Sequence, residues 1–222
     1  MLKIENVDIF GWNAAIRGLR NPMNSWDKSD MAWVNDGKEW ESVPAIDFDF
    51  DMGTKRIIGE NNLKLMKKLS KAGNDHAKFL RMINVTCDIT APLYWWKEHD
   101  QYKVGTTTNS CSTMHKIHAK EFTLDDFSHE HLSPWNETVL SNIIAELNTS
   151  RDQYLRTKNK DDWWQMIQLL PSSYNQRRTV QLNYQVLKSM YFARKDHKLD
   201  EWHTLCDWML TLPYFKEICV EN

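Results

Sequence analysis

The stretch LLPSSYNQRRTVQLNYQVLKSMYFAR, residues 169–194, is the most informative part of this sequence for its fold. The run DDWWQMIQLLP, which begins before this stretch and ends at Pro171, predicts a short helix that ends before the proline. The segment TVQLNYQVLKSMYFARK, residues 179–195, predicts a second helix. Arg177 and Arg178 precede this second helix, and Arg194 lies near its end. An arginine there either complements the helix dipole or binds a phosphate through two parallel hydrogen bonds.

A second unusual stretch, PLYWWKEHDQYKVGTTTNSCSTMH, runs from Pro92 to His115. Proline is tolerated in the first turn of a helix, so LYWWKEHDQYK is predicted to be helical. The segment that follows, TTTNSCSTMH, has many hydrogen-bonding side chains and almost nothing apolar to bury. It is either a solvated loop or a loop that wraps a polar ligand. Of the adjacent Trp95 and Trp96, at most one is expected to line a site, because neighbouring helical side chains point in different directions.

The remaining helix signals make the chain rich in helices. Gly73 ends an amphipathic run that begins at Gly59. Ser133 is expected to cap a long amphipathic helix that begins at Pro134. Helices are predicted over residues 13–19, 59–73, 93–103, 134–157, 161–170, 179–195 and 200–215.

Strand signals are fewer than helix signals. The segment FLRMINVTCDIT alternates and is rich in β-branched residues, which predicts a strand over roughly residues 79–90. A short strand is also expected just before the first helix. The acidic connector EWESVPAIDFDFDMGTKR, residues 39–56, alternates at Ile46, Phe48 and Phe50, which indicates an edge strand. With no internal repeat and no flexible linker, these elements predict one helix-rich α+β domain with a central sheet over residues 1–222.

The composition is that of a globular protein. The 222 residues are 41% apolar and 26% charged, and the formal net charge is -2. This charge argues against binding of DNA or RNA, because proteins that coat nucleic acids are clearly basic. No apolar run approaches the roughly 18 residues of a membrane span, so no membrane association is predicted. The N-terminus lacks the layout of a signal peptide, and we therefore expect a cytoplasmic protein.

Common catalytic and phosphate-binding motifs are missing from the sequence. Neither GxGxxG nor GxxxxGKS/T occurs, which excludes the usual dinucleotide and nucleoside triphosphate folds, and there is no GxSxG elbow. No pair of His or Cys ligands is joined by a second pair at zinc-site distance, so no metal site is predicted. The four cysteines form no CxxC pair and are expected to be reduced thiols. Cys111 with His115 as its base is an alternative nucleophile, although spacing alone does not establish such a pair.

The stretch 169–194 resembles the C-terminal motif of flavin-dependent thymidylate synthases. That motif has a Leu-Pro followed after twelve positions by an Asn and after eleven more by an Arg, and Pro171, Asn183 and Arg194 keep both spacings. The next segment, KDHKLDEWHTLCDWM, is similar in outline to the helix that follows in the family. The resemblance extends loosely over residues 55–215.

A second block of the resemblance surrounds the hydroxyl-rich segment. In the family an Ala-Pro begins a helix that delivers an Arg-His-Arg triplet nine residues later, and Gln101-Tyr102-Lys103 occupies that place here. A polar loop follows, in which Asn109 and Ser112 match the family's Asn and Ser. Met114 stands where the loop's closing Arg is expected, and His115 is the nearest substitute.

The resemblance implies a fold, a reaction and a set of ligands. It implies an α+β domain that forms a homotetramer with active sites between subunits. It also implies a methyltransferase with FAD that converts dUMP, or a related pyrimidine nucleotide, with NADPH and methylenetetrahydrofolate as co-substrates. The residues it places at the nucleotide are Arg194, Ser112, Asn109, His115 and Lys103. Those it places at the cofactor are Asn183, Gln101, Tyr102, Arg81 and His76, and it assigns no catalytic residue.

The departures from the family pattern are mostly losses of positive charge. The triplet keeps one cation of three, and Gln185 replaces an Arg expected two residues after Asn183. Each lost charge-assisted contact removes about 1.5–3 kcal/mol, which we expect Arg81, Arg177 and Arg178 to compensate. Two alternatives stay open. One is a divergent relative that binds a nucleotide without flavin chemistry or modifies another pyrimidine, and the other is a structural protein that keeps only the assembly.

Overall fold

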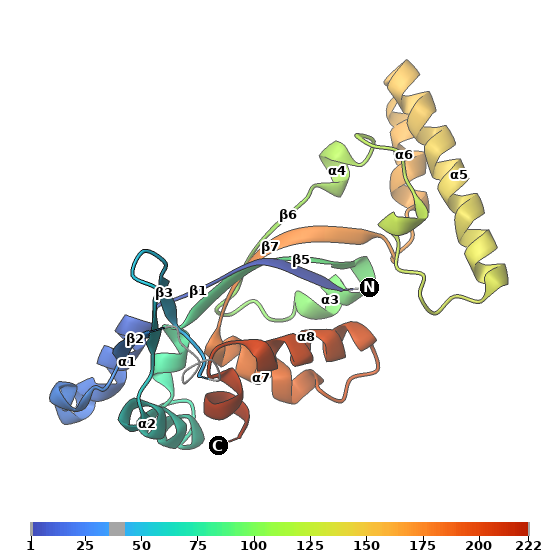
Figure 1. Ribbon diagram of the computed structural model, residues 1–222. Coiled ribbons are helices and arrows are strands. Elements are labelled where there is room, and N and C mark those ends of the chain that lie inside the picture. The colour runs from blue at the N-terminus through green and yellow to red at the C-terminus, as the bar shows by residue number, and fades with distance from the viewer. Residues whose placement is uncertain (1, 36–42, 222) are drawn as a thin grey trace. The chain divides into compact units, whose positions relative to one another are not determined.

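The computed structural model describes residues 2–35 and 43–221 (Figure 1). It combines helices and strands, so the predicted α+β class is confirmed. The α-helices are α1 (Trp12–Arg20), α2 (Glu60–Lys71), α3 (Leu93–His99), α4 (Thr113–Lys116), α5 (Pro134–Thr157), α6 (Lys160–Leu169), α7 (Tyr184–Arg194) and α8 (Asp200–Thr211). The strands are β1 (Lys3–Phe10), β2 (Ala32–Asn35), β3 (Asp47–Asp49), β4 (Thr54–Ile57), β5 (Asn84–Pro92), β6 (Thr107–Ser110) and β7 (Asn175–Asn183). The short turns are η1 (Asn21–Met23), η2 (Trp26–Lys28), η4 (Lys78–Arg81), η5 (Leu124–Asp126) and the π-helical η6 (Lys216–Val220).

The strands of the described residues form two sheets. One has four strands in the order β1-β5-β7-β6, and the other has three strands in the order β2-β4-β3. In the smaller sheet both pairings are antiparallel, and Arg56 on β4 lies between Trp33 on β2 and Asp47 on β3. The position of β3 confirms the predicted edge strand. Residues 39–42 of the predicted connector lie outside the described residues.

Contacts within the chain define two compact units. Unit 1 contains Asp88–Gln101 and Thr108–Val180, together with the start of the chain up to Glu5. Unit 2 contains Asn6–Cys87, Tyr102–Thr107 and the chain from Gln181 on. Strands β1, β5, β6 and β7 each continue from one unit into the other.

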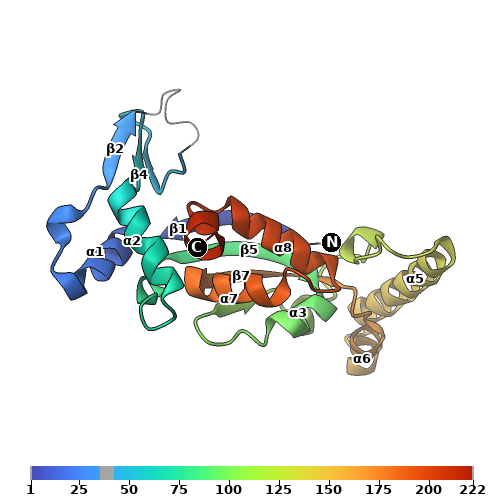
Figure 2. The same cartoon turned by 90° about the horizontal axis from the view of Figure 1, so that it is seen from below.

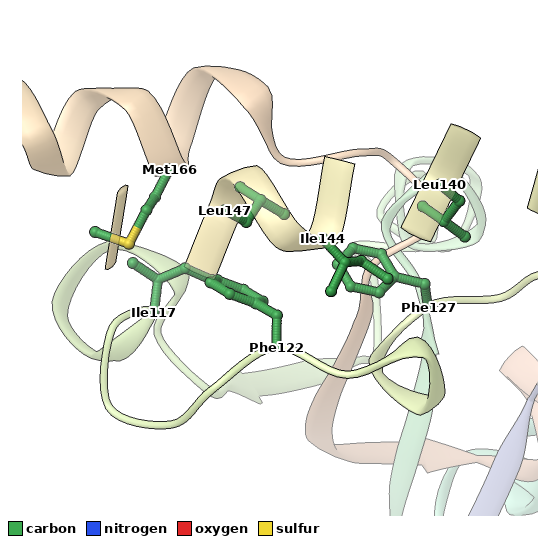
Figure 3. Packing of buried hydrophobic residues seen from close by; sticks show 7 residues of the cluster. All are labelled: Ile117, Phe122, Phe127, Leu140, Ile144, Leu147 and Met166. Carbon is green, nitrogen blue, oxygen red and sulfur yellow. The ribbon is translucent and has the colours of Figure 1, made fainter. Parts of the chain in front are cut away.

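A hydrophobic cluster in unit 1 lies between the antiparallel helices α5 and α6 and the segment before them. Figure 3 shows its side chains pointing toward one another. The buried members are Ile117, Phe122, Phe127, Leu140, Ile144, Leu147 and Met166. Asn148 on α5 connects this helix to the segment that precedes it. Its side chain accepts the Phe122 N–H at 2.8 Å and donates to the Phe122 carbonyl at 2.9 Å. The predicted cap is confirmed, since the Ser133 Oγ accepts the Asn136 N–H.

The core of unit 2 is aromatic and centres on Tyr184, the first residue of α7. Its fully buried ring meets those of Trp12 and Phe215 edge-on, each at 5.4 Å between centroids. Its hydroxyl donates to the Pro213 carbonyl at 2.8 Å, so the buried polar atom is satisfied. Helices α7 and α8 pack side by side in this unit (Figure 2). The rigid placement of α7 fixes the residues at both of its ends.

The largest difference from the sequence prediction concerns residues 175–183. They form strand β7, and the helix predicted from residue 179 begins only at Tyr184. Val180 and Leu182 are buried while Thr179 and Gln181 are exposed, which is the two-residue period of a strand. The long apolar pattern of α7 masked this short alternation.

Other elements also differ from the prediction, and α8 ends at Thr211, four residues before its predicted end at residue 215. Helix α3 ends at His99, four residues before its predicted end. Strand β5 begins at Asn84, because residues 78–81 form the turn η4, whose adjacent Phe79 and Leu80 are both buried and therefore do not alternate. Part of the hydroxyl-rich segment is strand β6, where backbone pairing rather than side-chain burial holds the chain.

Candidate functional site

Arg194, at the end of α7, lies in an aromatic setting within unit 2. Its Nε donates a hydrogen bond to the Tyr102 hydroxyl at 2.9 Å. Its guanidinium carbon lies 4.8 Å from the ring centre of Trp202 and 5.6 Å from that of Tyr102. A cation over two aromatic faces has few orientations available, because both stacking and the hydrogen bond restrict it. No motif or spacing in the sequence points to Trp202, which lies on α8 and is fully buried.

Asn183 occupies the N-cap of α7. Its Oδ1 accepts the Val186 N–H at 3.0 Å, and its Nδ2 lies 3.5 Å from the Gly105 carbonyl oxygen. Gly105 has φ +78°, and a Cβ there would lie 3.1 Å from both the Asn183 Nδ2 and the Val186 side chain. Asn183 therefore acts as a helix cap. The same side chain also contacts the segment that carries Tyr102.

Gln185, on the first turn of α7, connects the helix to the turn before η4. Its Nε2 donates to the Asn74 Oδ1 at 3.3 Å. Its Oε1 is buried and has no hydrogen-bond partner among the described residues. An orphaned buried acceptor is costly unless a donor from outside the chain satisfies it. Gln185 was noted in the sequence only as a departure from the family.

The contacts above bring three segments of unit 2 together. They are the turn at Asn74, which leads to His76, the segment from Tyr102 to Gly105, and helix α7 from Asn183 to Arg194. The side chains of Lys103, Arg81 and His76 are exposed. Unit 2 thus contains four of the predicted cofactor residues, namely Asn183, Tyr102, Arg81 and His76. It also contains two of the predicted nucleotide residues, Arg194 and Lys103.

The other predicted site residues belong to unit 1. Ser112 caps the single-turn helix α4, because its Oγ accepts the His115 N–H at 3.0 Å. Asn109 is on β6, whose residues are all exposed, and the His115 side chain is exposed as well. Gln101 follows α3, and its Nε2 lies 3.3 Å from the Glu98 carboxylate. Asn109 thus lies on a strand and not on the loop that was expected from the sequence.

The paired arginines of β7 are held by carboxylates of unit 1. Arg177 forms an ion pair with Asp88 at 2.6 Å, which raises the pKa of this guanidinium through the hydrogen bond and the nearby charge. Arg178 pairs with Asp100 at 2.7 Å and lies over the Trp96 ring at 4.1 Å. These contacts use two of the three cations that are expected to compensate for the altered triplet.

Both tryptophans of α3 are buried in the core of unit 1. Trp95 and Trp96 are fully buried, and Trp96 donates from its Nε1 to the Gln176 carbonyl at 2.9 Å. Gln176 in turn donates from Nε2 to the Cys111 carbonyl at 2.8 Å. This network positions the start of the α4 turn. Neither ring lines a surface on which a ligand stacks.

Three further features of the described residues concern cysteines, metal ligands and membrane spans. No disulfide joins the four cysteines, all of which lie within the described residues, and Cys111 is exposed while the other three are buried. Among the described residues, no cluster of three or more His, Cys, Asp or Glu side chains is arranged to hold a metal ion. No helix in residues 2–35 and 43–221 is both long and apolar enough to cross a membrane.

Comparisons with known proteins identify the fold. No protein-family model and no curated protein sequence matches the chain. Among solved structures, the chain is similar to the flavin-dependent thymidylate synthase ThyX from Helicobacter pylori complexed with FAD and dUMP, at a TM-score of 0.66 and 14% identity, covering 99% of this chain and 98% of that one. A second structure of Thymidylate Synthase X from Helicobacter pylori with FAD and dUMP gives a TM-score of 0.67 at 14% identity, covering 100% of this chain and 98% of that one.

The class of fold follows directly from these numbers. The chain has the fold of the flavin-dependent thymidylate synthases over its whole length, which confirms the resemblance at that level. Its low identity to both Helicobacter pylori structures fits a divergent sequence on this fold. Because one fold hosts several functions, the fold alone assigns no role to an individual residue.

Proposed function

We propose that this protein is a flavin-dependent methyltransferase that acts on dUMP or a related pyrimidine nucleotide. The observation that carries the proposal is the meeting of three segments in unit 2, at Asn74, Tyr102 and α7, on a fold shared with proteins complexed with FAD and dUMP. When bound, reduced FAD supplies a hydride that, with a one-carbon unit from methylenetetrahydrofolate, turns dUMP into dTMP and leaves tetrahydrofolate and FAD, which NADPH reduces again.

A buried acceptor in unit 2, on Gln185, suits a flavin ring. The buried Oε1 of Gln185 has no donor among the described residues, and a flavin ring carries an N–H that suits such an acceptor. Asn183 holds the Gly105 segment and the start of α7 in place beside it. We propose that Asn183, Tyr102, His76 and Arg81 hold the cofactor together with Gln185. Gln101, from unit 1, is the remaining proposed cofactor residue.

For the nucleotide, we propose that Arg194 binds the phosphate. Its guanidinium is oriented by Tyr102 and Trp202 before any ligand arrives, so little entropy is lost on binding. Lys103 adds a second cation in the same unit. Asn109, Ser112 and His115 of unit 1 are the other proposed nucleotide residues, and the Ser112 cap fixes the backbone of that segment.

The assembly and the setting belong to the same proposal. We propose a homotetramer whose active sites form between subunits, acting on free nucleotides in the cytoplasm and not on DNA or RNA. The net charge of -2 supports the last point. Size-exclusion chromatography with light scattering tests the assembly, and a mass of four chains is expected.

A second candidate function is nucleotide binding without flavin chemistry. It is favoured by the triplet Gln101-Tyr102-Lys103, which has one cation where three are expected. Arg177 and Arg178 are already engaged by Asp88 and Asp100 and offer little compensation. A protein of this kind would be stabilised by dUMP but not by FAD.

The visible absorbance spectrum of the purified protein separates the two candidates. The protein is saturated with FAD, desalted, and titrated with dUMP. A retained flavin spectrum that dUMP perturbs is expected, and Gln185→Leu is expected to lose the chromophore because it removes the acceptor at nearly constant volume. Gln165→Leu, on α6, is the matched control. A colourless protein that dUMP still stabilises would establish the second candidate, and one that neither ligand stabilises would leave only a structural role.

A further inference from the structure

Two adjoining cavities in unit 2 form a groove that contains none of the candidate site residues. Their volumes are about 400 and 340 Å³, within the size range of small-molecule sites. Both are lined by Ile9, Trp12, Ile46 and Asp47, so they lie next to each other. We call this the α1 groove, because it runs along the start of α1 and faces the edge strand β3.

One end of the groove is cationic. Arg17 on α1 and Arg56 on β4 both line the larger cavity, although they are distant in sequence. Neither guanidinium forms an ion pair with a residue in 2–35 or 43–221, and Arg56 lies only over the Trp33 ring at 5.7 Å. Asp47 is the single carboxylate lining this cavity, and its Oδ1 already accepts the Phe48 N–H at 3.0 Å. The charge balance of this end therefore favours an anion.

The backbone at the same end also presents donors. Gly11, Trp12, Asn13 and Ala14 line the larger cavity, and they form the first turn of α1. Among the described residues, this helix start has no side-chain cap and no acidic residue in its first turn. Its first N–H groups consequently lack intrahelical partners and carry the positive end of the helix dipole.

Trp12 provides an independent sign that the groove is incomplete. Trp12 is among the residues that line both cavities, and only 4% of it is exposed. Its Nε1 is buried without a hydrogen-bond partner in the described part of the chain. Most buried indole N–H groups have a partner, so an acceptor supplied by a ligand would remove this cost.

The other end of the groove is apolar and aromatic. Val7, Phe48, Phe50 and Pro213 line the smaller cavity together with Asp8. Phe48 and Phe50 are 49% and 90% exposed, and their rings stack at 5.9 Å between centroids. Large aromatic side chains held at the surface in this way are suited to a flat apolar body. A groove with one cationic end and one apolar end fits an amphipathic ligand.

We propose that the α1 groove binds a small organic anion with a flat apolar body. The anionic group, a carboxylate or a phosphate, contacts Arg17, Arg56 and the start of α1, and the apolar body lies on Phe48 and Phe50. This site is separate from the proposed nucleotide and flavin site and does not depend on it.

Isothermal titration calorimetry with model ligands tests the chemistry of the groove. Phenyl phosphate and benzoate are the probes with both features, and they distinguish a phosphate from a carboxylate. Inorganic phosphate lacks the body and benzyl alcohol lacks the charge. At least one probe is expected to bind with a dissociation constant below about 1 mM, and roughly tenfold more tightly than either partial ligand. The absence of saturable binding by both probes would overturn the proposal.

Substitutions locate the binding. Arg17→Gln and Arg56→Gln are each expected to weaken the better probe by about tenfold or more, since each removes a charge-assisted contact. Lys64→Gln, which removes one positive charge from an exposed position of α2 in the same unit, is expected to leave it unchanged. Arg194→Gln is also expected to have no effect. Binding that is lost in Arg194→Gln but kept in both groove variants would place the probe at the nucleotide site and overturn the proposal.

Discussion

The guanidinium of Arg194 is held by Tyr102, whose hydroxyl accepts a hydrogen bond from Nε at 2.9 Å. In the sequence resemblance, Tyr102 takes the place of the His in the Arg-His-Arg triplet of flavin-dependent thymidylate synthases. The ring of Trp202, 4.8 Å away, restricts the guanidinium from another side. The Tyr102 hydroxyl and the Trp202 ring therefore orient the guanidinium that we propose to bind the phosphate.

Tyr102→Phe is expected to weaken dUMP binding by roughly threefold to tenfold, because it removes one hydrogen bond worth about 1 kcal/mol and keeps the ring. Arg194→Gln is expected to weaken it by tenfold or more, since the charge itself is lost. Both affinities are measurable by calorimetry. If Tyr102→Phe matched the wild type while Arg194→Gln lost binding, Tyr102 would have no orienting role.

The side chain of Asn183 is expected to serve both stability and cofactor binding. Asn183→Ala should lower the free energy of unfolding by about 1 kcal/mol, the usual loss for a helix cap, and should also weaken FAD binding. Asn183→Ser keeps a capping oxygen, so its stability should stay within about 0.5 kcal/mol of the wild type while FAD binding is still weakened.

Asn159 offers a matched control, because its Oδ1 caps α6 by accepting the Asp161 N–H at 3.0 Å. Asn159→Ala should cost a similar amount of stability, read from urea denaturation, without any effect on FAD. Equal loss of FAD affinity in Asn183→Ala and Asn159→Ala would assign the effect to stability alone.

Much of the fold was predictable from local sequence signals. Ser133 and Pro134 mark the start of α5, and Gly73 follows the end of α2 with the positive φ of +102° expected of a helix stop. Strand β7 was missed because its two buried apolar residues, Val180 and Leu182, adjoin the stronger helical pattern of α7. A short alternation of this kind carries less periodic signal than a helix of three turns.

The candidate site was predictable only where a motif kept its spacing. Asn183 and Arg194 were found in this way, and they are indeed brought near the segment of Tyr102. Trp202 and the orphaned oxygen of Gln185 were not found, because their roles arise from tertiary packing between elements distant in sequence. The pairing of Arg178 with Asp100 was hidden for the same reason.

His99 gives the protein a pH-dependent stability. Burial lowers the pKa of this imidazole from 6.5 to about 4, Asp100 opposes the shift, and Arg178 reinforces it. Its ring packs 5.1 Å from those of both Trp95 and Trp96, where little water is available to solvate a charge.

Because the folded pKa is the lower one, the unfolded chain binds a proton at His99 between about pH 6.5 and 4 while the folded chain does not. The free energy of unfolding is therefore expected to fall as the pH falls through this window, by up to roughly 3 kcal/mol from this group. His99→Gln should flatten the pH dependence in that range relative to the wild type. Parallel profiles of the two proteins would show that another group is responsible.

Gly11 and Gly73 allow steric crowding to be separated from backbone strain. Both have positive φ angles, +97° and +102°, so alanine costs about 1 kcal/mol of strain at either position. At Gly11 a Cβ would also lie 1.9 Å from the Met82 carbonyl oxygen, whereas at Gly73 nothing lies within 4 Å. Gly11→Ala is therefore expected to lower the free energy of unfolding by about 3 kcal/mol or more, and Gly73→Ala by about 1 kcal/mol.

Equal losses of stability in urea denaturation would mean that the backbone at Gly11 moves freely away from Met82. The start of α1 would then not be the fixed wall on which the α1 groove depends.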